Sequence, residues 1–130
     1  MTSKKILLVI EDDASLRNIL HDGLEAEGFA VLEAEDGQKG LKTALSERPD
    51  LILLDILMPE MDGLTVMKEL RKANVWGKTV PIILITNVSP DNEKINSAIA
   101  ENEPAYYLVK SNISISSVIE KIKERLSIKI

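Results

Sequence analysis

The sequence predicts a doubly wound α/β domain in which helices cover both faces of a five-stranded parallel sheet. Two observations predict this fold class. Short apolar runs, rich in Ile, Val and Leu and without polar alternation, are typical of strands buried on both faces. Segments with helical spacing separate these runs, and such strict alternation requires crossover connections, which make a sheet parallel.

Five apolar runs define the predicted strands, and the second of them is the weakest. In chain order they are Ile6–Ile10, Ala30–Ala34, Leu51–Leu54, Pro81–Ile85 and Tyr106–Val109.

A predicted helix follows each strand, with apolar residues three or four positions apart on one face. The first helix ends at Gly28, a suitable C-terminal cap, and the second stops before Pro49, which cannot continue a helix. The fourth is short, and the fifth has the clearest apolar stripe. In chain order the apolar positions fall within Leu16–Leu24, Leu41–Leu45, Val66–Leu70, Ile95–Ile99 and Ile115–Leu126.

Composition limits the class of protein. The chain has 130 residues, so we expect one domain over residues 1–130. Its net charge of −5 argues against direct binding of nucleic acid or of an anionic membrane, and the lack of cysteine excludes disulfides and thiolate metal sites. The first apolar run is too short for a signal peptide, and no stretch approaches the roughly 20 apolar residues of a membrane span. We therefore expect a cytoplasmic protein without membrane insertion.

Polar side chains follow four of the predicted strands, where doubly wound sheets bind their ligands. Three carboxylates follow the first strand, one follows the third, a hydroxyl follows the fourth and an ammonium follows the fifth. Each has an ordinary interpretation on its own, because an aspartate also caps a helix or begins a loop. Asp13 in particular suits the cap of the helix that starts near Ala14. The residues are Glu11, Asp12, Asp13, Asp55, Thr86 and Lys110.

Taken together, these side chains predict a magnesium site that serves phosphoryl transfer. Crowded carboxylates repel one another unless a cation binds them, and oxygen ligands suit Mg²⁺. A carboxylate that attacks a phosphoryl group needs its charge repulsion neutralised, which Mg²⁺ and an ammonium both provide. An aspartyl phosphate is a known covalent product of such a reaction.

The chain resembles the receiver domain of two-component response regulators over essentially its full length. The resemblance rests on four stretches: ILLVIEDDASLR, PDLILLDILMPEMDG, PIILIT and YYLVK. The second is the most specific, because Asp55, Met58-Pro59 and Asp62-Gly63 stand at the family's spacing. The resemblance implies a flavodoxin-like (βα)5 fold and, with no output segment in the sequence, a stand-alone receiver domain.

The resemblance also implies roles for individual residues. Asp55 would be the phosphoacceptor. Asp12 and Asp55 would bind Mg²⁺ through their carboxylates, Leu57 through its backbone carbonyl and Glu11 through water. The Asp13 side chain falls one position beyond the acidic pair of the family.

Three further residues match the family's response machinery. Thr86 and Lys110 would contact the phosphoryl group, and Tyr107 would be the switch aromatic that turns inward as Thr86 moves. An ordinary, partly buried strand residue is the alternative for Tyr107. The implied partners are a sensor histidine kinase or phosphotransfer protein and a downstream protein, bound through the face of the fourth predicted helix, fifth strand and fifth helix.

The sequence departs from the family near the site. Ser111 stands where a proline usually follows the lysine across a cis bond, and without proline a cis bond costs about 2.5–4 kcal/mol, so we expect a trans Lys110–Ser111 bond. Asn87 replaces a small residue. The resemblance implies that the side chains of Leu57 and Val88 would flank the approach of water to the phosphoryl group. Because neither side chain can hydrogen-bond a water, we expect slow self-dephosphorylation.

Two other functions fit the same fold. One is an interaction domain that works without phosphorylation, against which Asp12, Asp55, Thr86 and Lys110 argue. The other is an aspartate-nucleophile phosphatase, whose pattern needs a second aspartate where this chain has Leu57. We therefore expect no conventional enzyme, but a domain that catalyses only its own phosphorylation and dephosphorylation.

Overall fold

Five parallel strands form one sheet in the order β2-β1-β3-β4-β5. The structure is a computed structural model that describes residues 4–89 and 92–128. The predicted parallel sheet of a flavodoxin-like domain is thus confirmed. The strands are β1 (Ile6–Ile10), β2 (Ala30–Ala34), β3 (Leu51–Leu54), β4 (Ile82–Thr86) and β5 (Tyr106–Val109).

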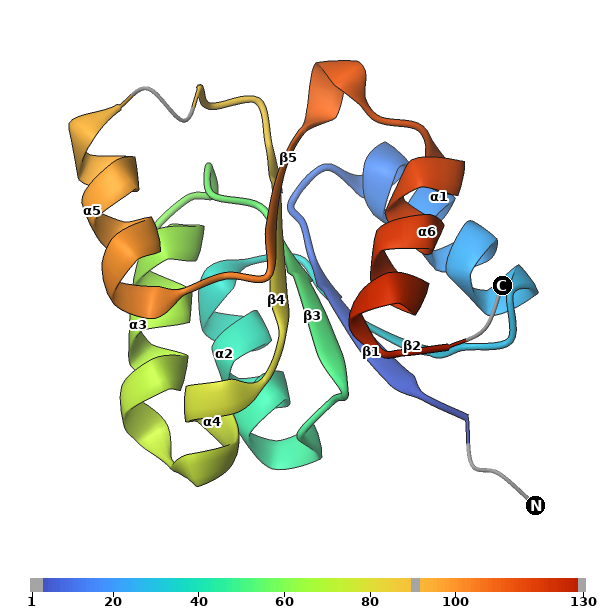
Figure 1. Cartoon of the computed structure of the whole chain (residues 1–130), viewed down its shortest axis with the longest axis horizontal. Helices are drawn as coiled ribbons and strands as arrows, with labels where there is room; N and C mark the ends of the chain where they lie inside the picture. Colours follow the sequence, from blue (N-terminus) through green and yellow to red (C-terminus); the bar gives the residue numbers. More distant parts are fainter. Residues whose placement is uncertain (1–3, 90–91, 129–130) are drawn as a thin grey trace.

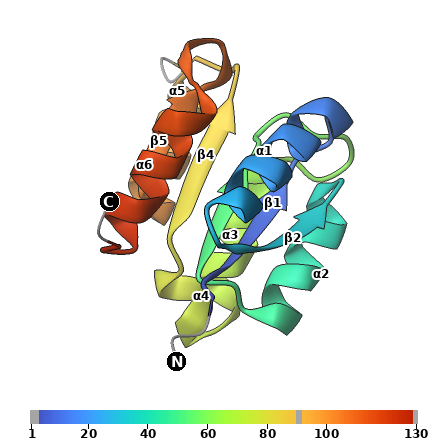
Figure 2. The same cartoon turned by 90° about the vertical axis from the view of Figure 1, so that its right-hand side faces the viewer.

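Helices cover both faces of the sheet (Figure 1). In Figure 2, α1 and α6 lie in front of the sheet, on the side away from α2 and α3. The helices are α1 (Ala14–Ala26), α2 (Gly37–Glu47), α3 (Gly63–Ala73), α4 (Val75–Thr79), α5 (Glu93–Asn102) and α6 (Ile115–Arg125), with the 3₁₀ helix η1 (Lys110–Asn112).

Alternate residues of each strand enter two separate apolar cores. Leu8 and Ile10 of β1 pack with residues of α2, α3 and α5, whereas Leu7 and Val9 pack with residues of α1 and α6. This division explains the unbroken apolar runs in the sequence, since both faces of a strand are buried. The two cores bury the sheet between the helix layers.

All six α-helices in the described part of the chain start at side chains that accept hydrogen bonds from backbone N–H groups of the first turn, as N-caps do. The Asp13 carboxylate accepts from the Leu16 N–H at 3.2 Å, which confirms its predicted capping role. The caps of these helices are Asp13, Asp36, Asp62, Asn74, Asn92 and Ser114.

Two details differ from the sequence prediction. The short helix α4, between α3 and β4, was not predicted, so the described residues contain six α-helices and not five. Strand β4 runs over Ile82–Thr86 and not Pro81–Ile85, because Pro81 has no N–H for the ladder and Thr86 pairs with Val109. No helix in the described part of the chain has the length and apolar character needed to cross a membrane.

Candidate functional site

The candidate site lies at the carboxyl edge of the sheet, the upper edge in Figure 1. The ladder aligns the strand ends here, because Ile10 pairs with Leu54 and Leu54 pairs with Leu84. Thr86 ends β4 opposite Val109 of β5. The residues at or just after these strand ends therefore lie at one edge of the sheet; they are Glu11, Asp12, Asp55, Thr86 and Lys110.

Three carboxylates meet at this edge. One oxygen from each of Glu11, Asp12 and Asp55 lies within 4.8 Å of the others. Glu11 and Asp55 are only 2% and 4% exposed, whereas Asp12 is exposed. Two buried carboxylates beside a third are unfavourable without a cation, because like charges held close together repel one another.

Lys110 supplies a positive charge to this cluster. Its Nζ donates to Asp55 Oδ2 at 2.9 Å and lies 2.8 Å from Glu11 Oε1. The direct pair between Lys110 and Glu11 was not predicted from the sequence, in which Glu11 was expected only to bind Mg²⁺ through water. One ammonium therefore bridges the two buried carboxylates.

The ionisation of Glu11 reflects this environment. Burial is the main cause that raises the pKa of Glu11 to about 7, with a smaller contribution from the charge of Asp55; hydrogen bonds from Lys110 and from the Asp13 N–H, and the charge of Lys110, act in the opposite direction. For Lys110, burial lowers the pKa, but the hydrogen bonds and charges of Glu11 and Asp55 together raise it above its ordinary value. The ammonium thus stays charged at neutral pH.

The backbone around Glu11 is held on both sides. The Glu11 N–H donates to the Ala34 carbonyl at 3.1 Å, and Arg17 Nη1 donates to the Glu11 carbonyl at 2.8 Å. The Asp13 N–H donates to Glu11 Oε2 at 3.1 Å. Arg17 was missed as a site residue from the sequence, although its spacing from the acidic pair, five residues beyond Asp12, was the available signal.

The loop after β3 brings α3 against the backbone of Asp55. The Gly63 N–H donates to the Ile56 carbonyl at 2.8 Å, and a Cβ on Gly63 would lie 2.1 Å from the Asp55 carbonyl oxygen. Only glycine allows this approach. The Leu57 N–H donates to Asp55 Oδ1 at 3.4 Å, while the Leu57 side chain is 60% exposed.

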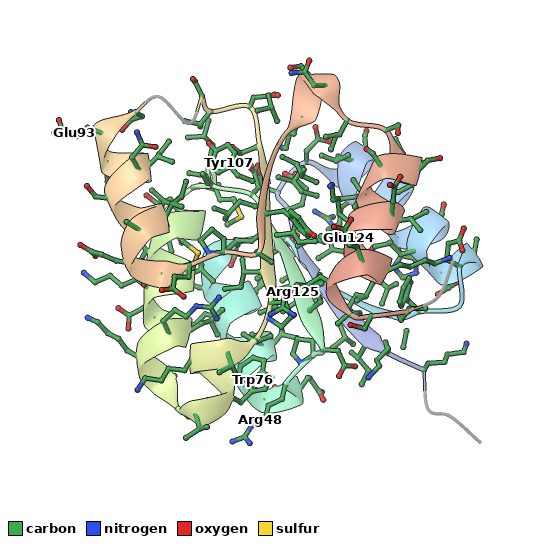
Figure 3. All side chains as sticks on the ribbon, in the orientation of Figure 1. Arg48, Trp76, Glu93, Tyr107, Glu124 and Arg125 are labelled. Carbon is green, nitrogen blue, oxygen red and sulfur yellow. The ribbon has the colours of Figure 1, made fainter. Side chains whose placement is uncertain are left out.

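Thr86 and Tyr107 are linked through the backbone of Val88. The Thr86 hydroxyl accepts from the Val88 N–H at 3.4 Å, and the Tyr107 hydroxyl donates to the Val88 carbonyl at 2.5 Å. Tyr107 lies on the α5 side of β5 (Figure 3), packed against the core. Burial, and then the charge of Asp55, raise the pKa of Tyr107.

Lys110 leads directly into η1. None of the described peptide bonds is cis, so the predicted trans Lys110–Ser111 bond is confirmed. The 3₁₀ turn Lys110–Asn112 follows β5, and Ser114 and Ser117 then form a capping box at the start of α6.

The donor set suits a small, hard cation. Carboxylate oxygens are the ligands that Mg²⁺ prefers, and an exposed carboxylate beside two buried ones leaves positions for water or a phosphoryl oxygen. An open depression lined in part by Asp12, Leu57 and Asp62 adjoins the cluster.

Residues 7–123 match the family described as the response regulator receiver domain, and the chain belongs to this family. Among curated proteins it is similar to the alkaline phosphatase synthesis transcriptional regulatory protein PhoP of Bacillus subtilis, with 37% identity over 91 residues, which cover 70% of this chain and 37% of that protein. It is also similar to the transcriptional regulatory protein ResD of the same organism, with 33% identity over 96% of this chain and 49% of that protein.

Solved structures give the same family. A CheY-like receiver domain protein from Methanospirillum hungatei superposes with a TM-score of 0.87 at 26% identity, covering 96% of this chain and 95% of that one. Receiver domains are signalling modules and not conventional enzymes, and they generally bind Mg²⁺ at an acidic pocket. This chain spans about 37% to 49% of the length of the two curated relatives.

Proposed function

We propose that this protein is a phosphoacceptor signalling module that receives a phosphoryl group on Asp55 from a histidine kinase or phosphotransfer protein in the cytoplasm. The observation that carries the proposal is the bridge of Lys110 Nζ to the buried carboxylates of Asp55 and Glu11, with Asp12 alongside. The Lys110 ammonium and the Leu57 N–H both donate to the Asp55 carboxylate, and Asp55 stands where the family resemblance implies the phosphoacceptor.

The transfer forms a bond between an Asp55 carboxylate oxygen and phosphorus. The bond from phosphorus to the imidazole nitrogen of a phosphohistidine breaks, and its electron pair returns to that nitrogen. Lys110 offsets the charge that the incoming phosphoryl group adds, and the Thr86 hydroxyl donates to a phosphoryl oxygen. Leu57 at the exposed rim limits the access of water.

Mg²⁺ would be held by the carboxylates of Asp12 and Asp55 and the backbone carbonyl of Leu57, with Glu11 acting through water. When bound, it neutralises negative charge on the carboxylates and on the phosphoryl group. The three-carboxylate cluster supports this assignment.

The response to phosphorylation would pass from Thr86 to Tyr107. Both side chains bond the same peptide segment at Val88, so a movement of the Thr86 hydroxyl toward Asp55 changes the position of the carbonyl that Tyr107 holds. The partner surface in this proposal is the face of α5, β5 and α6, on which Tyr107 and Glu124 lie to opposite sides of β5 (Figure 3).

Intact-mass measurement tests the proposal. Wild type incubated with acetyl phosphate and Mg²⁺ should gain one phosphoryl group, and it should gain none when EDTA replaces Mg²⁺. The Asp55→Asn variant should remain unmodified under the same conditions. A wild type that binds Mg²⁺ but accepts no phosphoryl group would favour the interaction domain that works without phosphorylation.

A further inference from the structure

Arg17 reaches back from the first turns of α1 to the end of β1, where the acidic residues begin. Its Nη1 donates to the backbone carbonyl of Glu11 at 2.8 Å, so the guanidinium bonds the peptide group that joins Glu11 to Asp12. A hydrogen bond from a charged donor is stronger than a neutral one and fixes the plane of that peptide.

The contacts around this peptide leave its geometry little freedom. On one side, the Glu11 N–H is bonded to the Ala34 carbonyl. On the other, the Asp13 N–H is bonded to the Glu11 carboxylate, and the Asp13 carboxylate caps α1. Asp12 makes none of these bonds itself, so the direction of its exposed carboxylate follows from its neighbours.

We propose that Arg17 is a positioning residue for the metal site, which holds the Asp12 carboxylate within reach of Asp55 and so sets the affinity for Mg²⁺. This inference rests on the proposed function, because it takes Asp12 and Asp55 as the ligands. It assigns to Arg17 an effect on metal binding that passes through the Glu11 carbonyl and not through contact with the ion.

The charge of Arg17 and its positioning role predict opposite effects on the affinity for Mg²⁺. The guanidinium is a cation beside a cation site, so its charge alone weakens Mg²⁺ binding, and its removal should tighten binding. If Arg17 acts by position, its removal should weaken binding, because partners that orient metal ligands typically contribute about 10–100-fold in affinity. The sign of the change therefore separates the two effects.

The test is a titration with Mg²⁺ alone, followed through backbone amide NMR shifts near residues 12 and 55. It is carried out well below the melting temperature of every variant. Arg17→Gln removes both the charge and the donor fork. Lys42→Gln is the matched control, since Lys42 is an exposed cation that borders the same surface depression as Arg17. Arg17→Lys keeps the charge and one donor group.

We expect Arg17→Gln to weaken Mg²⁺ binding roughly tenfold, Lys42→Gln to leave it unchanged or slightly tighter, and Arg17→Lys to recover part of the loss. Equal or tighter binding by Arg17→Gln, with saturable binding by wild type, would overturn the role of Arg17 alone. No saturable shift in wild type would overturn the metal role of the cluster as well. If Arg17→Gln does not fold, Arg17→Lys must still bind more weakly than Lys42→Gln, and equal affinities would refute the inference.

Discussion

Replacing Lys110 by glutamine tests how the acidic cluster is stabilised without metal. Lys110 Nζ contacts Asp55 at 2.9 Å and Glu11 at 2.8 Å, and the variant leaves both buried carboxylates without their cation. Removing one partner of a buried ion pair costs about 3–5 kcal/mol, because the remaining charge stays desolvated. We expect a loss of this size in the free energy of unfolding at pH 8.

The loss should depend on pH through Glu11. The pKa of Glu11 in the fold, about 7, lies above the ordinary value of 4.5. Its contribution to the stability of the fold is therefore fully present below pH 4.5, and it is lost as the pH rises through 7 and the buried carboxyl group ionises. The hydrogen bond from Lys110 lowers this pKa, so the variant raises it further and keeps Glu11 protonated to a higher pH. The difference between variant and wild type should therefore be smaller at pH 5.5 than at pH 8.

Urea unfolding followed by far-ultraviolet circular dichroism in EDTA measures both effects. Lys121→Gln is the control, because Lys121 forms a more exposed pair with Glu124 at 3.8 Å and should cost less than about 1 kcal/mol. Saturating Mg²⁺ should restore more stability to Lys110→Gln than it adds to wild type. A loss below 1 kcal/mol, or an equal loss at both pH values, would refute the reasoning.

Three further changes have defined outcomes. Mg²⁺ at about 100 times its Kd should stabilise wild type by about 2.7 kcal/mol, and Asp12→Ala should lessen that gain in melting experiments; an unchanged gain removes Asp12 from the site. Arg71 donates to the carbonyls of Gly77, Val80, Asn102 and Glu103, so Arg71→Met should cost about 1–3 kcal/mol in urea unfolding, while the exposed Lys72→Met stays within about 0.5. The double variant Leu57→Asn, Val88→Glu should lose its phosphoryl group several times faster than wild type; equal decay rates would show that the apolar rim gives no protection.

Most of the fold follows from local patterns in the sequence. Four of the five strands have the predicted bounds, since apolar runs such as Leu51–Leu54 end sharply at a polar residue. Helix α4 was not predicted, because a five-residue helix is too short to show a periodic apolar pattern and because it contains Gly77, a poor helix former. The end of β4 was misplaced by one residue, because Thr86 suits both a strand and a loop.

The residues of the candidate site could be predicted from the sequence, but the contacts between them could not. The order of strands brings Asp12, Asp55 and Lys110 to one edge, which the α/β topology alone implies. The pair between Lys110 and Glu11 and the bond from Arg17 to a carbonyl depend on tertiary distances that residue spacing does not encode. The contact of Tyr107 with Val88 likewise depends on the path of the β4–α5 loop.

Peptide mapping after borohydride reduction tests the central claim most directly. An acyl phosphate is reduced to an alcohol, so a phosphorylated aspartate becomes homoserine and can be located by mass spectrometry. After incubation with acetyl phosphate and Mg²⁺, the account predicts homoserine at position 55 and unchanged aspartate at positions 12 and 13. Reduction at position 12 or 13 with an intact Asp55 would contradict the assignment of Asp55 as the phosphoacceptor.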